Sequence, residues 1–265
     1  MKKVIYICLF GKYDQLLQPL VIDNSFDYIC FSNDFEEERI GVWEIRKIHY
    51  GSIANSSRLS RYAKILPYQV LSEYDYSLYL DANIQIKESS LYDVVNERIA
   101  EGHLVCQVPH LVSDCTYDEI RKAYFAGRVS LKEAQKHYQH LVSNKFPIKY
   151  GLFENNILLR KHNNRKIIEI SDAWWEEYIS FSKRDQFCLM YVYWKHNYMP
   201  NYLFDSIHNV RNVESLRYLY HLKSGKLESR LQRIGKNNPL RRMGRIFHTQ
   251  IKNIFIKLFL SKKVD

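Results

Sequence analysis

The chain has 265 residues, 46% of them hydrophobic and 14% aromatic, with nine Gly, six Pro and a net charge of +10. This length and composition suit one large α/β domain and exclude a disordered chain or a repetitive fibre. Five widely spaced cysteines without a C-x-x-C pair, and no apolar stretch near the ~18 residues of a membrane span, predict a cytoplasmic protein with reduced thiols.

Apolar runs at residues 3–10 and 27–32 predict two buried strands, and a third short strand is expected around 42–48. The first run is short and lacks a small-residue cleavage site, so it does not read as a signal peptide. Strands alternating with helical patterns predict a mostly parallel sheet flanked by helices, with ligands beyond the carboxyl ends of the strands. Three candidate donor-binding residues follow the first two strands: Gly11, Tyr13 and Asp34.

Residues 55–70 predict a helix that Asn55 can cap, with Pro67 either ending it or starting a second segment. Its apolar residues fall on one face at helical spacing. Three basic residues fall on the other face: Arg58, Arg61 and Lys64. Such a stripe is either a solvated surface or a clamp on a diphosphate, because basic side chains match phosphate oxygens.

The run 76–86 is apolar except for Asp81 and Asn83 in its middle. If the run is one strand, alternation places both side chains on one face, with Gln85 following them. Two oxygen-bearing side chains at the end of a buried strand can hold a divalent cation and the phosphates it carries. The alternative is a strand followed by an Asx turn.

A strand is also expected at 103–108, and His110 follows it closely. This histidine could serve as an acid, a base or a sugar-binding group, although a lone histidine is more often a structural hydrogen bonder. Thr116 with Glu119 fits a capping box, which predicts a plain helix start just beyond.

Two polar pairs precede later apolar elements and could contact sugar hydroxyls across a cleft. They are Glu154 with Asn155, ahead of a strand at 157–160, and Asp185 with Gln186, ahead of a helix at 187–194. For the first pair the alternative is an ordinary polar loop. For the second it is a capping box formed by Ser182 and Asp185. Either His208 or His221 could supply a third metal ligand, and we take His208 as the candidate.

The net charge is concentrated at the C-terminus, which predicts a body at 1–215 and a basic tail at 216–265. Residues 217–265 carry 13 Lys and Arg and two acidic residues, a net charge of +11. The preceding residues carry 26 Lys and Arg and 27 acidic residues, a net charge of −1. A nucleic-acid-binding domain normally carries its basic patch on the folded body, so no nucleic-acid partner is expected. Residues 240–263 repeat apolar residues at helical spacing among basic ones, which indicates a helix at a membrane surface. The alternative is a helix docked on its own domain or on a second copy.

Five blocks, in order, resemble a family of glycosyltransferase-like proteins from bacteria and plants, catalogued as domain of unknown function 616. The blocks are 56–68, 73–86, 109–119, 151–163 and 174–194. The resemblance implies a GT-A-like fold, in which a D-x-D motif binds a metal and the diphosphate of a nucleotide sugar. Asp81 and Asn83 take the D-x-D positions. Asp185 and Gln186 are similar to an Asp-Gln pair near the reacting sugar in several retaining GT-A enzymes. The neutral Asn83 implies weaker metal binding, or more diphosphate neutralisation by the basic helix.

Together these features predict a metal-dependent glycosyltransferase, using Mn²⁺ or Mg²⁺, that moves a sugar from a nucleotide-sugar donor to a glycan or lipid-linked acceptor. Bacterial surface polysaccharide synthesis is the expected setting, with the tail at the inner face of the membrane. The expected catalytic residues are Asp185, Gln186 and Glu154, with His110 and Asn155 on the sugar and acceptor side. The alternatives are a non-enzymatic binding protein that uses its tail, and a hydrolase with the same metal site.

Overall fold

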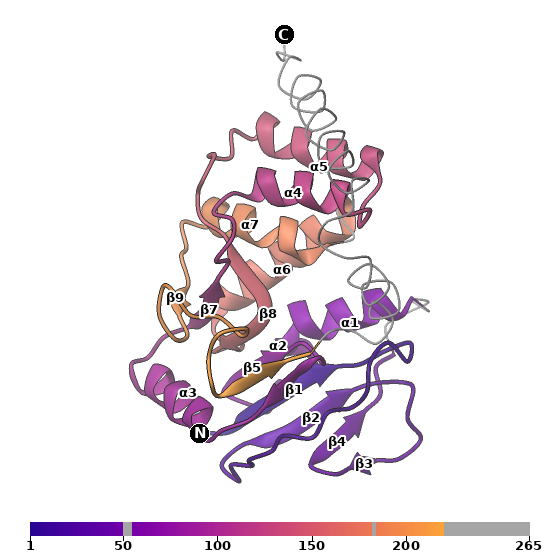
Figure 1. The fold of residues 1–265 in the computed structure, drawn as a ribbon, viewed down its shortest axis with the longest axis vertical. Coiled ribbons are helices and arrows are strands. Elements are labelled where there is room, and N and C mark those ends of the chain that lie inside the picture. The colour runs from indigo at the N-terminus through magenta and orange to yellow at the C-terminus, as the bar shows by residue number, and fades with distance from the viewer. Residues whose placement is uncertain (50–54, 182–183, 220–265) are drawn as a thin grey trace, which may run out of the picture. The chain divides into compact units, whose positions relative to one another are not determined.

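The computed structural model describes residues 1–49, 55–181 and 184–219, so most of the basic tail, His221 and Ser182 lie outside the described residues. The described part contains an eight-stranded mixed sheet (Figure 1). Its order is β3 (Arg39–Ile40), β4 (Trp43–Arg46), β2 (Asp27–Phe31), β1 (Lys3–Cys8), β5 (Tyr76–Leu80), β8 (Phe153–Arg160), β7 (Val105–Pro109) and β9 (Asn201–Tyr202). The predicted α/β class, with a mostly parallel sheet flanked by helices, is confirmed.

The strand directions bring several carboxyl ends to one edge of the sheet. β4, β2, β1 and β5 run parallel, and β8 is antiparallel to both β5 and β7. β7 therefore ends at the same edge as β5. We refer to this edge as the carboxyl edge; it is where ligands of parallel sheets bind.

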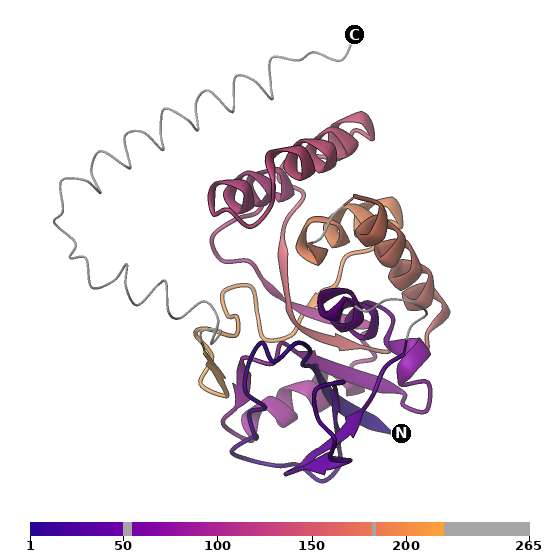
Figure 2. The ribbon, with the colours of Figure 1, turned by 90° about the vertical axis from the view of Figure 1, so that its right-hand side faces the viewer.

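Helices cover both faces of the sheet (Figures 1 and 2). The helices are α1 (Ser56–Ile65), α2 (Pro67–Val70), α3 (Ser90–Ala100), α4 (Thr116–Phe125), α5 (Leu131–Ser143), α6 (Arg165–Phe181), the short 3₁₀ helix η1 (Asp185–Phe187) and α7 (Leu189–Lys195). On one face, Leu91 and Val95 of α3 pack with Leu78 and Leu80 in the main apolar cluster. On the other face, the Tyr6 hydroxyl donates to the carbonyl of Ala63 in α1.

The basic helix forms as predicted, and its ends have clear causes. Asn55 caps α1 by accepting hydrogen bonds from the amides of Ser57 and Arg58. Pro67 occupies the first turn of α2, where the missing N–H has no cost. The predicted capping box at Thr116 is wrong, because α4 starts without any side-chain cap.

The single strand predicted at 76–86 is also wrong. β5 ends at Leu80, and a short β6 (Ile84–Ile86) begins after a turn closed by the amide of Ile84 on the carbonyl of Asp81, at 2.9 Å. β6 leaves the main sheet and pairs with β10 (Leu216–Tyr218). Because this turn interrupts the strand, strand alternation does not relate the side chains of Asp81 and Asn83.

All five cysteines are free, as predicted, and all five are buried. Across residues 1–49, 55–181 and 184–219, no helix combines the length and apolar character required to cross a membrane.

Two buried histidines give the fold a testable pH dependence. Burial lowers the pKa of His137 and that of His162 to about 4 each. In the unfolded chain these histidines have pKa values near 6.5, so between pH 6.5 and pH 4 they bind protons that the folded protein does not bind. Their contribution to the free energy of unfolding is therefore complete above pH 6.5 and falls toward pH 4. Each histidine contributes on the order of 3 kcal/mol across that window.

We expect the urea unfolding free energy to drop between pH 7 and pH 4.5, and His137→Gln to flatten this dependence. An unchanged slope in the variant would contradict the assignment to His137.

Candidate functional site

Asp81 stands at the carboxyl edge, directly beyond β5. Its amide donates to the carbonyl of Asn156 at 2.8 Å, so the chain is still paired with β8 at this residue. Its Oδ1 accepts a hydrogen bond from the Tyr79 hydroxyl at 2.6 Å and lies 3.6 Å from the Lys64 Nζ. The side chain is 31% exposed, so the carboxylate remains within reach of a ligand.

Lys64 joins two carboxylates that are distant in sequence. Its Nζ lies 2.7 Å from Oδ2 of Asp185 as well as 3.6 Å from Asp81, and its side chain is only 3% exposed. Of the two alternatives for the basic stripe, a solvated surface does not hold for Lys64. Because α1 packs against the sheet here, Lys64 is buried, and of the three basic residues only Arg58 is exposed.

Asp185 is a buried carboxylate paired with two cations. Its Oδ1 lies 3.0 Å from Nε of Arg61, and its side chain is 8% exposed. Burial alone would raise the pKa of this carboxyl, but Arg61 and then Lys64 outweigh burial and hold the pKa well below its usual range. A carboxylate held in this way is a poor general base.

Arg160 and Tyr6 hold the end of α1 in place, and sequence reasoning did not identify either. The buried Arg160 Nη2 donates to the carbonyl of Lys64 and to the Tyr6 hydroxyl, both at 2.6 Å. A guanidinium at a helix C-terminus interacts favourably with the helix dipole. This pair therefore fixes the turn that carries Lys64.

Glu154 lies inside β8, not ahead of the strand as predicted, and is buried. Arg211 Nη1 lies 2.6 and 2.5 Å from its two oxygens, and Asn156 Nδ2 donates to it at 2.5 Å. Asn209 adds a further bond at 3.3 Å. The carboxylate is thus fully engaged in holding the loop of Asn209 and Arg211 against the sheet.

Gln186 and Asn155 tie η1 to β8. The Gln186 amide accepts from the backbone of Asn155 at 3.2 Å and donates to the carbonyl of Phe153. Asn155, likewise buried within β8, accepts from Gln107 at 3.2 Å. These bonds bring Asp185 to the strand that pairs with Asp81.

The loops after β1 and β2 reach the same edge. Gly11 has a positive φ of 74°, and a Cβ there would stand 3.1 Å from the Ser56 hydroxyl, so the loop packs closely on the start of α1. Asp34 accepts from the amide of Lys12 at 2.8 Å, which links the two loops. Tyr13 is 42% exposed beside them.

Each of the two predicted histidines that the structure describes lies near a local carboxylate. His110 lies 3.9 Å from Glu119, which is beyond hydrogen-bond distance. His208 pairs with Asp205 at 2.7 Å on an exposed loop. Among the residues that the structure describes, no three His, Cys, Asp or Glu side chains are grouped to hold a metal ion.

Asp81 and Asn83 nevertheless fit a hard divalent cation in their chemistry. Asn83 is buried and donates through Nδ2 to the carbonyl of Leu219 at 2.6 Å, while its Oδ1 is buried without a partner in the described part of the chain. A carboxylate oxygen and an amide oxygen are ligands that Mg²⁺ and Mn²⁺ accept, and Mg²⁺ sites often use few protein ligands plus phosphates.

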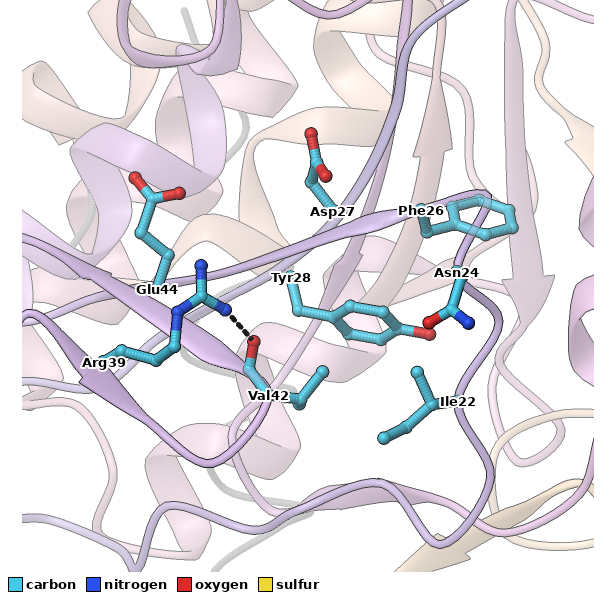
Figure 3. Close-up of a pocket in the computed structure, with 8 residues that line it drawn as sticks. All are labelled: Ile22, Asn24, Phe26, Asp27, Tyr28, Arg39, Val42 and Glu44. Atoms are coloured by element: carbon cyan, nitrogen blue, oxygen red, sulfur yellow. Dashed lines mark hydrogen bonds between the residues drawn. The ribbon is translucent and has the colours of Figure 1, made fainter.

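A separate pocket of about 220 Å³ lies away from these residues (Figure 3). It is lined by Ile22, Asn24, Phe26, Asp27, Tyr28, Arg39, Val42 and Glu44. Asp27 and Tyr28 are the first residues of β2, so the pocket stands at the opposite end of that strand from the carboxyl edge. None of the predicted site residues lines it.

Residues 1–220 match the model of a family described as "TOD1/MUCI70, glycosyltransferase-like domain". No curated protein matches the chain.

Several solved glycosyltransferases are partly similar in structure. The apo form of the bifunctional WbbM is 12% identical with a TM-score of 0.42, covering 76% of this chain and 38% of its own. The galactosyltransferase LgtC, solved with donor and acceptor sugar analogues, is 14% identical with a TM-score of 0.42 and coverages of 70% and 69%. Core-mannan synthase A from Aspergillus fumigatus, in an Mn/GDP form, is 11% identical with a TM-score of 0.43 and coverages of 72% and 69%. This chain thus spans well under half of WbbM.

Proposed function

This chain belongs to the TOD1/MUCI70 family of glycosyltransferase-like domains, and we propose that it transfers a sugar from a nucleotide-sugar donor bound at the carboxyl edge. One observation carries the proposal. Lys64 lies between Asp81 and Asp185, so a helix and two distant segments meet where the parallel strands end. Buried charges at such an edge are costly to maintain and are typical of functional sites.

The charges at this edge favour a donor that arrives with a cation. Arg61 and Lys64 carry two positive charges, and Asp81 and Asp185 carry two negative ones. A diphosphate therefore needs further positive charge, which the exposed Arg58 and a divalent ion can supply. Asp81 and Asn83 would hold that ion, and when bound it would neutralise charge on the leaving diphosphate.

In the proposed transfer, the acceptor hydroxyl oxygen bonds to the anomeric carbon while the bond from that carbon to the diphosphate breaks. The electron pair of the broken bond leaves with the nucleoside diphosphate. The hydroxyl proton passes to the leaving phosphate or to water. Arg61 and Lys64 stabilise the developing negative charge through a fixed field. Asp185 keeps these two cations in place and, as a carboxylate, favours positive charge on the sugar.

The proposed acceptor is a glycan or a lipid-linked precursor of a surface polysaccharide. The basic tail supports this, because its +11 charge would draw a cytoplasmic enzyme to an anionic membrane.

We expect flotation of the protein with vesicles of anionic lipid, and we expect this flotation to be lost when residues 240–265 are removed. Neutral vesicles are the control. Equal flotation of both forms would exclude the tail as the membrane contact.

The proposed function is tested with a panel of nucleotide sugars and Mn²⁺, following release of nucleoside diphosphate with and without EDTA. We expect turnover of at least one donor, abolished by EDTA. Absence of donor binding and turnover across the panel would refute the proposal. Lipid or glycan hydrolysis without a donor would indicate a hydrolase, and salt-sensitive nucleic-acid binding would indicate a binding protein.

A further inference from the structure

His110 follows β7 directly, so it lies at the carboxyl edge. Its amide donates to the carbonyl of Leu152 at 2.9 Å, just before β8 begins. The carbonyl of the next residue, Phe153, accepts a hydrogen bond from the Gln186 side chain. His110 and the 3₁₀ helix η1 are therefore both attached to the start of β8.

Glu119 is a buried carboxylate in the first turn of α4, and the residue is 7% exposed. The predicted capping box would have used this carboxylate, but α4 starts without a side-chain cap. Among the described residues, the basic side chain within 4.0 Å of it is His110, whose Nε2 lies 3.9 Å from Oε2, and no hydrogen bond reaches the carboxylate. A buried carboxylate in this state is costly, which indicates a ligand that completes its hydrogen bonding.

The gap between His110 and Glu119 suits one hydroxyl group. Because Nε2 and Oε2 are 3.9 Å apart, an oxygen atom about 2.8 Å from each can stand between them. The two side chains are 18% and 9% exposed, so the gap is open to a small group. A hydroxyl donates its proton to the carboxylate, which only accepts, and accepts the Nε2–H of the imidazole. A carbonyl has no proton for Glu119, and an ammonium group has no lone pair for His110.

Arg184 connects Glu119 to the donor side of the site. It directly precedes Asp185, and α4 contacts η1. Burial lowers the pKa of Arg184, whereas the nearby charges of Asp185 and Glu119 raise it. One guanidinium therefore lies within electrostatic range of both carboxylates, and Glu119 shares the environment of Asp185.

We propose that His110 and Glu119 bind a hydroxyl group of the transferred sugar. The inference rests on the proposed function, in which Asp185 favours positive charge on that sugar. A sugar bound near Asp185 brings its ring hydroxyls to the neighbouring side chains, and the hydroxyl between His110 and Glu119 fixes the orientation of the ring. The pair rejects a donor without this hydroxyl, because the buried carboxylate then stays without a hydrogen bond.

Equilibrium binding to the full chain, with Mn²⁺ present, tests this subsite. The probes are the nucleotide sugar of the panel that the wild type binds most tightly and the corresponding free nucleoside diphosphate. Glu119→Met should weaken binding of the nucleotide sugar about tenfold or more, the effect of losing a hydrogen bond to a charged group. Binding of the free diphosphate, which lacks the transferred sugar, should change by less than about threefold, as for groups that do not interact.

Analogues of the nucleotide sugar that each lack one hydroxyl identify the group that is bound. The wild type should bind one analogue about tenfold or more weakly than the complete nucleotide sugar, whereas Glu119→Met should bind both with equal affinity. A purely structural role for Glu119 would weaken both ligands equally and leave this preference intact.

Glu101→Met is the matched control. Glu101 and His103 form a similar pair, 3.0 Å apart, just before β7 and so at the opposite end of that strand. This variant should bind both probes within about threefold of the wild type, as for an ordinary surface substitution.

Circular dichroism and urea unfolding identify any variant that fails to fold. Glu119→Gln, which keeps the shape of the side chain, then serves as the second variant and should weaken nucleotide-sugar binding about fourfold, because a charged acceptor bonds about twice as strongly as a neutral one. A folded Glu119 variant that binds the nucleotide sugar as tightly as the wild type, or keeps the wild-type preference among the analogues, would overturn this subsite alone. A wild type that binds no nucleotide sugar would refute the proposed function as well.

Discussion

Replacing Lys64 with methionine is expected to lower the free energy of unfolding by about 3 kcal/mol, because the change leaves the Asp185 carboxylate buried with one cation fewer. Lys64 is 3% exposed and lies 2.7 Å from Asp185. Arg61, at 3.0 Å from the same carboxylate, remains and limits the loss. Urea denaturation at pH 7 measures the effect, with Tm as a second readout.

A double-mutant cycle separates this pairing from simple loss of packing. Lys64→Met combined with Asp185→Asn should cost less than the sum of the two single changes, because neither charge is then left alone. Lys87→Met is the control: Lys87 pairs with Glu88 on the surface, and such pairs contribute at most about 1 kcal/mol. Additive costs in the cycle would show that Lys64 and Asp185 are not coupled.

Replacing Asp81 with alanine is expected to lower donor turnover by at least about 100-fold, the effect of removing one main electrostatic contact to a transition state. The side chain is 31% exposed and makes one hydrogen bond, so the unfolding free energy should fall by only about 1 kcal/mol. The measurement is the rate at which nucleoside diphosphate is released from a nucleotide sugar that the wild type turns over.

Asp75 provides a matched control for Asp81. It lies just before β5, at the opposite end of the same strand, where its carboxylate accepts from the Lys2 amide at 2.7 Å. Asp75→Ala should leave turnover unchanged. If the two variants lose equal activity, the reacting groups do not lie at the carboxyl edge.

Local patterns in the sequence correctly predicted several strands and the basic helix. Apolar runs identified β1, β2 and β5, and Asn55 and Pro67 marked the ends of the basic helix. These features depend on residues a few positions apart, which is why they can be read directly. The same reasoning predicted that Gly11, Tyr13 and Asp34 lie at the carboxyl edge, because the carboxyl ends of parallel strands meet at one edge of a sheet.

The contacts that define the site depend on distant residues, and here sequence patterns failed. Helical spacing placed Lys64 on the helix face opposite the apolar residues, yet its side chain is buried beside Asp81 and Asp185. Alternation predicted one strand through Asp81 and Asn83, whereas both residues lie in the turn between β5 and β6, and β6 pairs with β10.

The central claim is that Asp81 marks the donor site, and equilibrium binding tests it without any need for an acceptor. UDP and GDP are titrated into the wild type and into Asp81→Ala and Asp75→Ala, each with Mn²⁺ and with EDTA. We predict Mn²⁺-dependent nucleotide binding to the wild type and to Asp75→Ala, and a loss of at least about tenfold in Asp81→Ala. Nucleotide binding of equal strength in a folded Asp81→Ala would contradict the claim.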